Sequence, residues 1–301
     1  MGLEVANLSK SYNGKKVVDN ISFTIDKPGV FGLLGSNGAG KTTTIRMILG
    51  ILNKESGSIN WNGKQVKREL VNFGYLPEER GIYPKSTLVN QLIYFACLKG
   101  MKKSDAEEAA KYWCEKLGVY EYFNKPAEQL SKGNQQKAQL IIALMHNPEL
   151  LILDEPFSGL DPVNTKIIKE VIDEIIKNGT YIVMSSHQMS VVEEYCRDIL
   201  ILSKGKTVLS GNLSEIKKSY GKNNLVIKTN NDISKYIPEG FKIVDKTVDT
   251  YDFKITSQND ASKFLKELVN NNIEVEKFEI KEPSLQEIFI EKVGGNKWKI
   301  Y

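Results

Sequence analysis

The chain has 301 residues, of which 41% are apolar and 26% are charged, as is typical of a globular protein with one large and one smaller domain. A formal net charge of +4 argues against a dedicated nucleic-acid-binding protein, because such proteins have a stronger basic bias. The three cysteines are widely spaced and suggest no disulfide framework, so we expect a reducing compartment. The sequence shows no secretory signal and no run of ~18 apolar residues that could cross a bilayer.

Short strands around one helix are predicted for the first part of the chain. Residues 3–34 have the pattern of several strands, with a turn at Asn13-Gly14, a dipeptide typical of hairpins. A second hairpin is expected over residues 56–65. Between them, the apolar strand of residues 29–34 leads into a glycine-rich loop, and residues 42–49 form a helix that ends before Gly50.

The glycine-rich loop is the most informative feature of this sequence. It fits the phosphate-binding pattern G-x-x-x-x-G-K-[ST] at every fixed position, and it lies between a strand and a helix, as that pattern requires. Backbone N–H groups of such a loop and the start of the helix attract phosphate groups. We expect Lys41 to reach the β- and γ-phosphates and Thr42 to bind Mg²⁺. The residues predicted to bind the nucleotide in this segment are Gly35, Ser36, Asn37, Gly38, Ala39, Gly40, Lys41, Thr42 and Thr43.

Helices and strands alternate in the middle of the chain. Residues 87–130 have a helical pattern, and a polar helix opens after Ser131, which is a plausible N-cap. Further elements are expected in the order strand, helix, strand and hairpin, over residues 150–154, 164–177, 181–185 and 198–209. Strands that alternate with helices predict a parallel sheet that is covered on both faces.

Polar side chains follow two of these strands. Asp154 and Glu155 end one apolar strand and His187 ends the next, at the edge of a parallel sheet where nucleotides bind. We expect Asp154 to hold Mg²⁺ and Glu155 to act as the general base that activates water. His187 is expected near the γ-phosphate, whereas no role is assigned to His146.

The composition changes near residues 219–224, and a small α+β domain is predicted beyond them. Strands and helices are expected to alternate there in the order β-α-β-α-β-α with one extra strand, and no motif in this region suggests a chemistry. The expected strands lie over residues 225–228, 241–248, 253–256 and 275–280, and the expected helices over residues 261–269 and 284–293.

Residues 1–215 resemble the ATP-binding subunits of ABC transporters. The phosphate loop resembles the Walker A motif of that family, residues 150–155 resemble its Walker B motif, and residues 130–134 resemble its signature motif. Residues 158–161 resemble the D-loop, and His187 matches the switch histidine. These motifs follow one another in the order of the family, so the resemblance is specific.

The resemblance implies an α/β fold with a P-loop NTPase core in residues 1–216. That core would include an antiparallel β subdomain and a helical subdomain over about residues 87–148. Residues 217–301 would form the small accessory α+β domain.

The resemblance also implies how ATP is held. Two subunits would enclose two ATP molecules, each between the phosphate loop of one subunit and Ser131 and Gly133 of the other. Asp161 of the D-loop is included among the nucleotide-binding residues, and Tyr12 matches the aromatic residue that stacks on adenine. A helix start offers N–H donors, but it closes around a phosphate held elsewhere only if a second chain brings it there.

Within the family, residues 74–81 resemble the exporter branch that includes sodium-extrusion and drug-resistance ATPases. Glu78 stands where most members have Gln; its carboxylate could ligate Mg²⁺, but it cannot donate an N–H. Lys132 and Asn134 also depart from the usual signature motif, while Ser131 and Gly133 are retained.

The predicted function is that of an ATP-hydrolysing motor subunit of a transporter, with ATP and Mg²⁺ as cofactors. The expected partners are a membrane-spanning permease and a second ATPase subunit, identical or related, and no nucleic acid. The expected location is cytoplasmic, at the inner face of the cell membrane. Tyr83, Tyr94 and Phe95 are candidate contacts with the permease, with core packing as an equal alternative.

Two other classes of protein compete with this interpretation. A soluble ABC-type ATPase acting on the ribosome or DNA usually has two cassettes or a long coiled coil, whereas this chain has one cassette and no sustained heptads. A P-loop kinase would lack the signature segment and would transfer phosphate to an acceptor.

Overall fold

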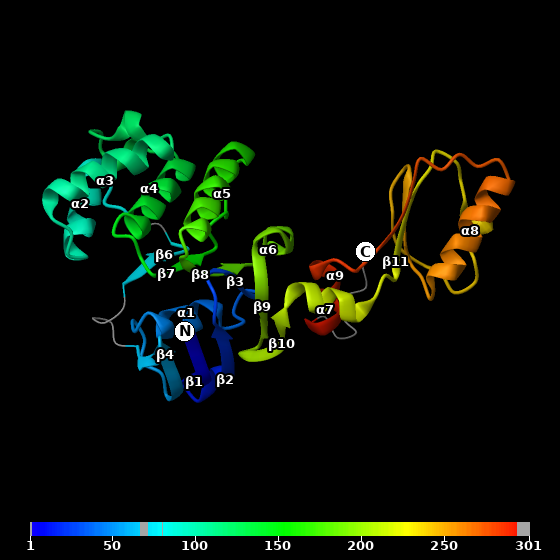
Figure 1. Cartoon of the computed structure of the whole chain (residues 1–301), viewed down its shortest axis with the longest axis horizontal. Coiled ribbons are helices and arrows are strands. Elements are labelled where there is room, and N and C mark those ends of the chain that lie inside the picture. The colour runs from blue at the N-terminus through cyan, green and yellow to red at the C-terminus, as the bar shows by residue number, and fades with distance from the viewer. Residues whose placement is uncertain (1, 67–71, 80, 294–301) are drawn as a thin grey trace. The chain divides into compact units, whose positions relative to one another are not determined.

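The computed structural model describes residues 2–66, 72–79 and 81–293, and the chain divides into two compact units, residues 1–210 and 211–301 (Figure 1). Residue 80 of the segment 74–81 and residues 294–301 of the predicted C-terminal domain lie outside the described residues. The domain boundary after residue 216 stays a prediction. None of the helices formed by the described residues combines the length and the apolar character that crossing a bilayer requires.

The first unit contains a four-stranded antiparallel sheet in the order β2-β1-β4-β5. Its strands are β1 (Leu3–Tyr12), β2 (Lys15–Ile25), β4 (Ser56–Trp61) and β5 (Lys64–Gln65). β1 pairs antiparallel with β2 and with β4, which confirms the predicted hairpin at Asn13-Gly14. Both turn residues have positive φ, 49° and 75°, the conformation that makes Asn-Gly favourable in tight hairpins.

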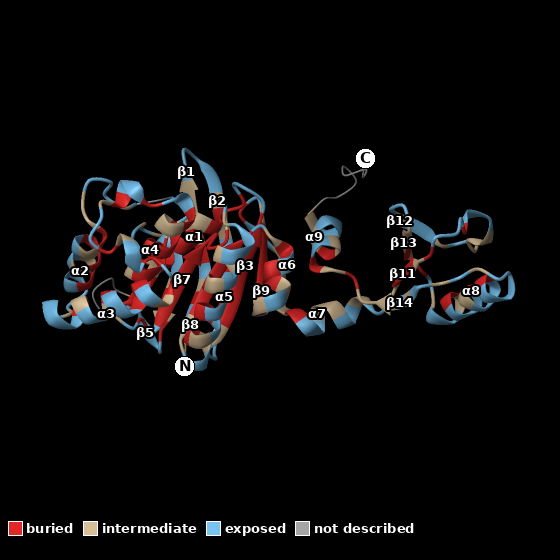
Figure 2. Ribbon diagram, turned by 90° about the horizontal axis from the view of Figure 1, so that it is seen from above, coloured by how far each residue is buried: buried red, intermediate tan, exposed pale blue. Residues whose placement is uncertain are grey.

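A six-stranded sheet in the order β10-β9-β3-β8-β7-β6 forms the centre of the first unit. Its strands are β3 (Gly29–Gly35), β6 (Phe73–Leu76), β7 (Leu150–Asp154), β8 (Tyr181–Ser186), β9 (Cys196–Ser203) and β10 (Lys206–Asn212). The pairs β3·β8, β3·β9, β6·β7 and β7·β8 are parallel, as the alternation of strands and helices predicts. β7 is buried along its whole length, because both faces of the sheet are covered (Figure 2).

Helices and the antiparallel sheet provide that cover. The helices of this unit are α1 (Lys41–Ile48), α2 (Leu88–Leu98), α3 (Lys103–Lys116), α4 (Lys132–Leu144), α5 (Pro162–Lys177) and α6 (Met189–Tyr195). α2 and α3 pack on each other and on α4. α5 begins two residues before the predicted position, because Asp161 caps it and Pro162 suits the first helical position. In α2 Leu88, Leu92 and Ala96 lie about one helical turn apart and are buried, while Phe95 is half-buried.

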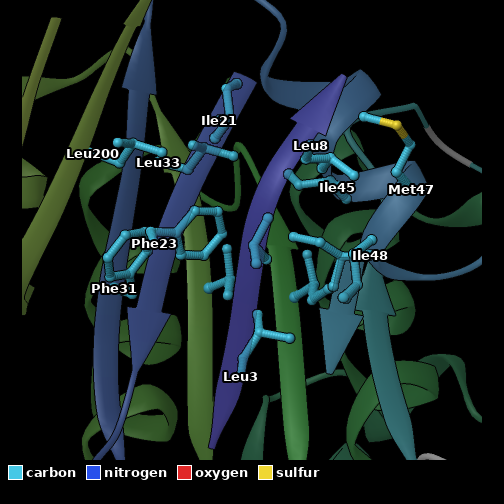
Figure 3. Packing of buried hydrophobic residues seen from close by; sticks show 14 of the residues in the cluster. Leu3, Leu8, Ile21, Phe23, Phe31, Leu33, Ile45, Met47, Ile48 and Leu200 are labelled. Carbon is cyan, nitrogen blue, oxygen red and sulfur yellow. The ribbon is translucent and has the colours of Figure 1, made fainter. Parts of the chain in front are cut away.

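The main hydrophobic core lies between the antiparallel sheet, α1 and one face of the central sheet. Phe23 of β2 stacks on Phe31 of β3 with ring centroids 4.8 Å apart, and Ile45 and Ile48 of α1 are completely buried in the same cluster (Figure 3). Such burial contributes about 1.5–3 kcal/mol for each large apolar side chain. The core therefore holds α1, and the loop before it, firmly against β3.

The second unit has a four-stranded antiparallel sheet in the order β12-β13-β11-β14. Its elements are α7 (Leu213–Tyr220), β11 (Asn224–Lys228), β12 (Lys242–Lys246), β13 (Thr250–Lys254), α8 (Gln258–Asn270), β14 (Lys277–Lys281) and α9 (Leu285–Val293). The predicted order β-α-β-α-β-α is wrong here, because three strands precede α8, whereas each predicted strand and helix lies close to an observed element. The chain between β11 and β12 forms only a 3-10 turn, since Pro238 and Gly240 disfavour a longer helix.

Candidate active site

The loop between β3 and α1 depends on glycine at two positions. A Cβ atom on Gly35 would lie 2.6 Å from the carbonyl oxygen of Leu202, and one on Gly40 would lie 2.7 Å from that of Val17. Gly40 also has a φ of 107°, which side chains rarely tolerate, and it is the residue from which α1 starts. Both glycines are therefore required for the close packing that shapes the loop.

A pocket of about 210 Å³ lies over this loop, and we call it the loop pocket. Two acidic side chains from other segments join the loop there, Glu78 after β6 and Glu155 after β7. The lining residues are Val17, Ser36, Asn37, Gly38, Ala39, Gly40, Lys41, Thr42, Thr43, Glu78 and Glu155. The structure therefore brings together all the predicted residues of the phosphate loop except Gly35, which is the last residue of β3. Val17 lines the pocket but was not predicted to bind the nucleotide.

Lys41 is buried, and its ammonium group donates a hydrogen bond to the carbonyl oxygen of Gly35 at 2.7 Å. Its Nζ atom lies 3.8 Å from Oε1 of Glu155. The backbone of the loop thus fixes the single cation of the loop pocket beside a carboxylate. A phosphate group bound in this pocket would meet a positioned ammonium group and the start of α1.

Asp154 is only 1% exposed at the end of β7. The hydroxyl group of Ser185 donates a hydrogen bond to Oδ1 of Asp154, whereas Oδ2 has no hydrogen-bond partner among the described residues. Burial raises the pKa of Asp154, and the hydrogen bond from Ser185 together with the nearby Thr42 hydroxyl partly opposes that rise. A buried carboxylate oxygen without a partner is costly, so this geometry suits a ligand that completes its coordination.

Glu155 is buried and adopts a φ of 52°, an uncommon conformation for a residue other than glycine. Its N–H group donates to the carbonyl oxygen of Ser185 at 3.2 Å and to Oγ of Ser185 at 3.1 Å. Nδ1 of His187 lies 2.8 Å from Oε2 of Glu155, and the N–H group of His187 donates to the same oxygen at 3.4 Å. The carboxylate of Glu155 is therefore held between Lys41 and His187 at the wall of the loop pocket.

Ser185 is the residue of this site to which the sequence analysis gave no role. Its hydroxyl group contacts Asp154 and the backbone of Glu155, so one side chain positions both acids. The signal was present in the sequence, because Ser185 ends an apolar strand two residues before His187. It was missed because the register of β8 against β7, which places Ser185 opposite Asp154, is a property of the sheet.

Tyr12 lies outside the lining of the loop pocket and is 46% exposed. The ammonium group of Lys10 lies 5.6 Å from the centre of its ring. One face of an exposed aromatic ring beside a cation is available for stacking with a planar group.

Ser131, Gly133 and Asp161 also lie outside the lining of the loop pocket. Ser131 caps α4 and accepts a hydrogen bond from the N–H group of Asn134 at 3.2 Å, and Asp161 caps α5 in the same way through Asn164. A Cβ atom on Gly133 would lie 2.9 Å from the amide nitrogen of Asn164, so glycine allows the two helix starts to approach each other. The structure therefore joins the signature-like segment to the D-loop-like segment and leaves both apart from the phosphate loop of the same chain.

Oxygen atoms suitable for a hard divalent cation are present in the site. They belong to the Thr42 hydroxyl, to Asp154 with its unpartnered Oδ2, and to the exposed carboxylate of Glu78. No cluster of three His, Cys, Asp or Glu side chains that could hold a metal ion by itself occurs in the part of the chain that the structure describes. Such a site suits Mg²⁺, which takes one or two carboxylates together with phosphate oxygens and water.

Comparison with known proteins assigns both units to families. Residues 18–158 match the family described as "ABC transporter", and residues 211–293 match the family described as "ATP-binding protein DrrA1-3-like, C-terminal domain". The chain is 47% identical to the ABC transporter ATP-binding protein YhaQ of Bacillus subtilis, over 97% of this chain and 99% of the relative.

Two further relatives have more informative names. The chain is 30% identical to the linearmycin resistance ATP-binding protein LnrL of Bacillus subtilis, over 97% of this chain and 98% of the relative. It is 32% identical to the bacitracin transport ATP-binding protein BcrA of Enterococcus faecalis, over 97% and 96% of the two chains. A solved structure of an ATP-binding subunit of an ABC transporter matches 73% of this chain and 94% of its own, with a TM-score of 0.68 and 31% identity. The chain therefore belongs to the ATP-binding subunits of ABC transporters, which bind and hydrolyse ATP.

Proposed function

We propose that this chain is the motor of an exporter, and that ATP closes two ATPase subunits on each other while a separate membrane-spanning chain carries the substrate. The observation that carries this proposal is the position of Glu155. Its carboxylate is held between Lys41 and His187 at the wall of the loop pocket, whereas Ser131 and Gly133 lie elsewhere on the chain. One subunit supplies the phosphate loop and the base, so a second subunit has to supply the helix start of its own α4.

The chemistry assigns one role to each group. Glu155 accepts a proton from the attacking water. The oxygen of that water forms a bond to the γ-phosphorus, while the bond between the γ-phosphorus and the bridging oxygen of ADP breaks. Lys41 offsets the charge of the phosphates. His187 orients the carboxylate of Glu155, which it contacts at 2.8 Å. The products are ADP and inorganic phosphate.

Asp154, Thr42 and Glu78 are proposed to hold Mg²⁺, which would neutralise phosphate charge when it is bound. The unpartnered Oδ2 of Asp154 supports this role. Glu78 adds a second negative charge that the usual Gln would not.

A variant at the start of α4 tests the proposed arrangement of two subunits. In a dimer of two copies, each subunit would bring the start of its α4 to the nucleotide on the other subunit. Ser131→Arg places a long cationic side chain at that helix start. We expect ATP binding by the monomer to be unchanged and the dissociation constant of the ATP-bound dimer to rise more than about tenfold. Light scattering in the presence of ATP measures the amount of dimer, with every variant made in the Glu155→Gln background. Ser104→Arg, on the exposed start of α3, is the matched control. An ATP-dependent dimer of the Ser131→Arg protein would contradict the proposal.

A groove of about 780 Å³ beside α2 supports a membrane partner. Tyr83 and Tyr94 line it and are exposed, while Phe95 is half-buried and stacks on Tyr83 with ring centroids 6.2 Å apart. Gln91 is buried beneath the groove and exchanges hydrogen bonds with the backbone of Tyr83, which fixes the shape of the groove. Exposed aromatic side chains around a preformed groove are typical of a surface that receives a helix.

Isolation of the tagged chain from detergent-solubilised membranes tests the membrane partner. We expect a protein with several membrane spans to co-purify with the wild type and with the control Tyr120→Glu. It should be lost from Tyr94→Glu, because burial of an unpaired carboxylate in an apolar contact is costly. Recovery of ribosomes or DNA instead would favour the soluble ABC-type ATPase. Co-purification with a membrane-spanning protein would also place the chain at the inner face of the membrane.

The direction of transport is proposed from the relatives and from the branch that residues 74–81 resemble. The names of LnrL and BcrA refer to linearmycin resistance and bacitracin transport, which suits export of a noxious compound. ATP-driven flux in vesicles that contain the complex would test this direction.

A further inference from the structure

A second pocket of about 580 Å³ lies at the starts of β7 and β8, and we call it the strand-start pocket. Its lining includes Glu149 just before β7 and Tyr181 at the start of β8, whereas Asp154 and the loop pocket lie where those strands end. The volume is within the range of small-molecule sites, about 300–1,000 Å³. Nothing in the ATPase mechanism uses this pocket.

Two acidic side chains line the strand-start pocket, and one of them, Glu174, is already paired with Lys116. Glu149 and Glu174 line it, and the described part of its lining contains no Lys or Arg. α4 and α5 both end beside it, at Leu144 and Lys177, and Leu144 and Asn178 are part of its wall. Because a helix C-terminus carries a partial negative charge, both helix ends favour a cation, and Lys177 in the last turn of α5 offsets part of that charge.

One side of the pocket already shows this chemistry within the chain. The ammonium group of Lys116 forms an ion pair with Glu174 and lies 5.5 Å from the ring centre of Trp113. The phenolic oxygen of Tyr112 accepts a hydrogen bond from the same ammonium group at 2.9 Å. A carboxylate and two aromatic rings thus surround an ammonium group that α3 itself supplies.

The other side of the pocket has the same components without a cation among the described residues. Nε1 of Trp61 donates to Oε2 of Glu149 at 2.8 Å, and Trp61 packs edge-on against Tyr181 with ring centroids 5.1 Å apart. Glu149 is exposed at the pocket and forms no ion pair with any residue that the structure describes. The Trp61 contact fixes the direction of the carboxylate, and no described lysine or arginine pairs with its charge.

We propose that the strand-start pocket binds a small organic cation with N–H donors, such as the primary ammonium groups of a polyamine. Glu149 would pair with one ammonium group, and the ends of α4 and α5 would attract the remaining charge. The aromatic walls suit the methylene chain between the ammonium groups. The proposal does not depend on the direction of transport or on the membrane partner.

Tryptophan fluorescence offers a direct measurement, because two of the three tryptophans, Trp61 and Trp113, line the pocket. A Trp298→Phe background leaves only these two. Titration of the nucleotide-free protein with spermidine is expected to give a saturable change with a Kd below about 1 mM. Tetramethylammonium has a positive charge and no N–H group, so it should not reproduce the change at the same ionic strength.

Three variants make the test specific. Glu149→Gln keeps an oxygen acceptor for Trp61 and removes the charge, so spermidine affinity should fall about tenfold. Asn178→Asp adds a carboxylate at the exposed end of α5 and should raise the affinity several-fold, about threefold or more. Glu170→Gln makes the same charge change as Glu149→Gln on the exposed face of α5, away from the pocket, and should leave the affinity unchanged.

A circular dichroism melt of each variant checks that it is folded. Absence of saturable binding to the wild type would overturn the proposal, as would equal affinities in Glu149→Gln and Glu170→Gln. An equal response to tetramethylammonium would overturn the requirement for N–H donors. Failure of ATP hydrolysis in the same preparations would bear on the motor function and not on this pocket.

Discussion

The two ends of β7 and β8 carry opposite chemistry. At the ends of these strands lie the start of α1, a cation fixed by the backbone and two acids joined by Ser185. At their beginnings lie the ends of α4 and α5, two exposed or half-buried glutamates and aromatic walls.

The difference follows from the polarity of a parallel sheet. Strands that run in one direction place the following helix starts at one edge and the preceding helix ends at the other. One edge thereby favours anions and the other favours cations before any side chain is chosen. The side chains strengthen both tendencies, with Lys41 at the first edge and Glu149 at the second. The following predictions test this division.

The largest effect is expected at Glu155. Glu155→Gln removes the proposed base and leaves the phosphate loop intact, so turnover should fall about 10²–10⁴-fold while ATP still binds and the dimer accumulates. Phosphate release and light scattering measure the two properties. Glu170→Gln, an equal change of charge on α5, is the control. Turnover at the wild-type rate in Glu155→Gln would remove Glu155 from the chemistry.

The next effect concerns the cation of the loop pocket. Lys41→Ala removes an ammonium group that the Gly35 carbonyl holds at 2.7 Å, so ATP affinity should fall about 10–100-fold. Isothermal titration with ATP measures the change, and Lys103→Ala at the exposed start of α3 serves as the control. Unchanged affinity would mean that the anion preference of this edge comes from the backbone alone.

A smaller effect is expected at Tyr12, which lies outside the lining of the loop pocket. Tyr12→Ala should weaken ATP binding about 5–10-fold through lost stacking on adenine, while binding of inorganic triphosphate should not change. Tyr12→Phe should retain the affinity for ATP. Equal losses for ATP and triphosphate would show that Tyr12 acts on the loop and not on the base.

The smallest effect is one of stability. Burial raises the pKa of Asp154, so the folded chain holds this proton more tightly than the unfolded chain. The contribution of Asp154 to stability is therefore most favourable below the ordinary Asp pKa of 3.8 and is lost as the pH rises through the folded-state value.

The side chain of Asp154→Asn cannot ionise, so the variant avoids the loss of stability that ionisation of buried Asp154 causes. We expect the melting temperature of the protein without nucleotide and Mg²⁺ to rise by about 2–4 °C at pH 7, with loss of ATP hydrolysis. Thermal melts at a series of pH values provide the measurement, and the gain should shrink as the pH is lowered toward 3.8. A variant that is less stable than the wild type at pH 7 would show that the carboxylate is already compensated in the ligand-free chain.

Much of the fold and site could be predicted from local sequence. The phosphate loop was predictable because its glycines are needed at fixed positions, two of them to avoid backbone atoms at 2.6 and 2.7 Å. Asp154 and Glu155 were predictable because an apolar strand has to end where polar groups begin. In the second unit the strands and helices lie close to their predicted ranges, but the order β-α-β-α-β-α was wrong, because three strands precede α8.

The sequence by itself determined the identity of the loop, the acids that follow β7 and the family, since each rests on neighbouring residues with fixed spacing. Only the tertiary structure placed Ser185 against both acids and left Ser131 apart from the loop pocket, because these relations depend on strand register and helix packing. It alone brought Trp61, Glu149 and Tyr181 together, since Trp61 and Tyr181 belong to different sheets and Glu149 precedes β7, and they become neighbours only when the two sheets pack together.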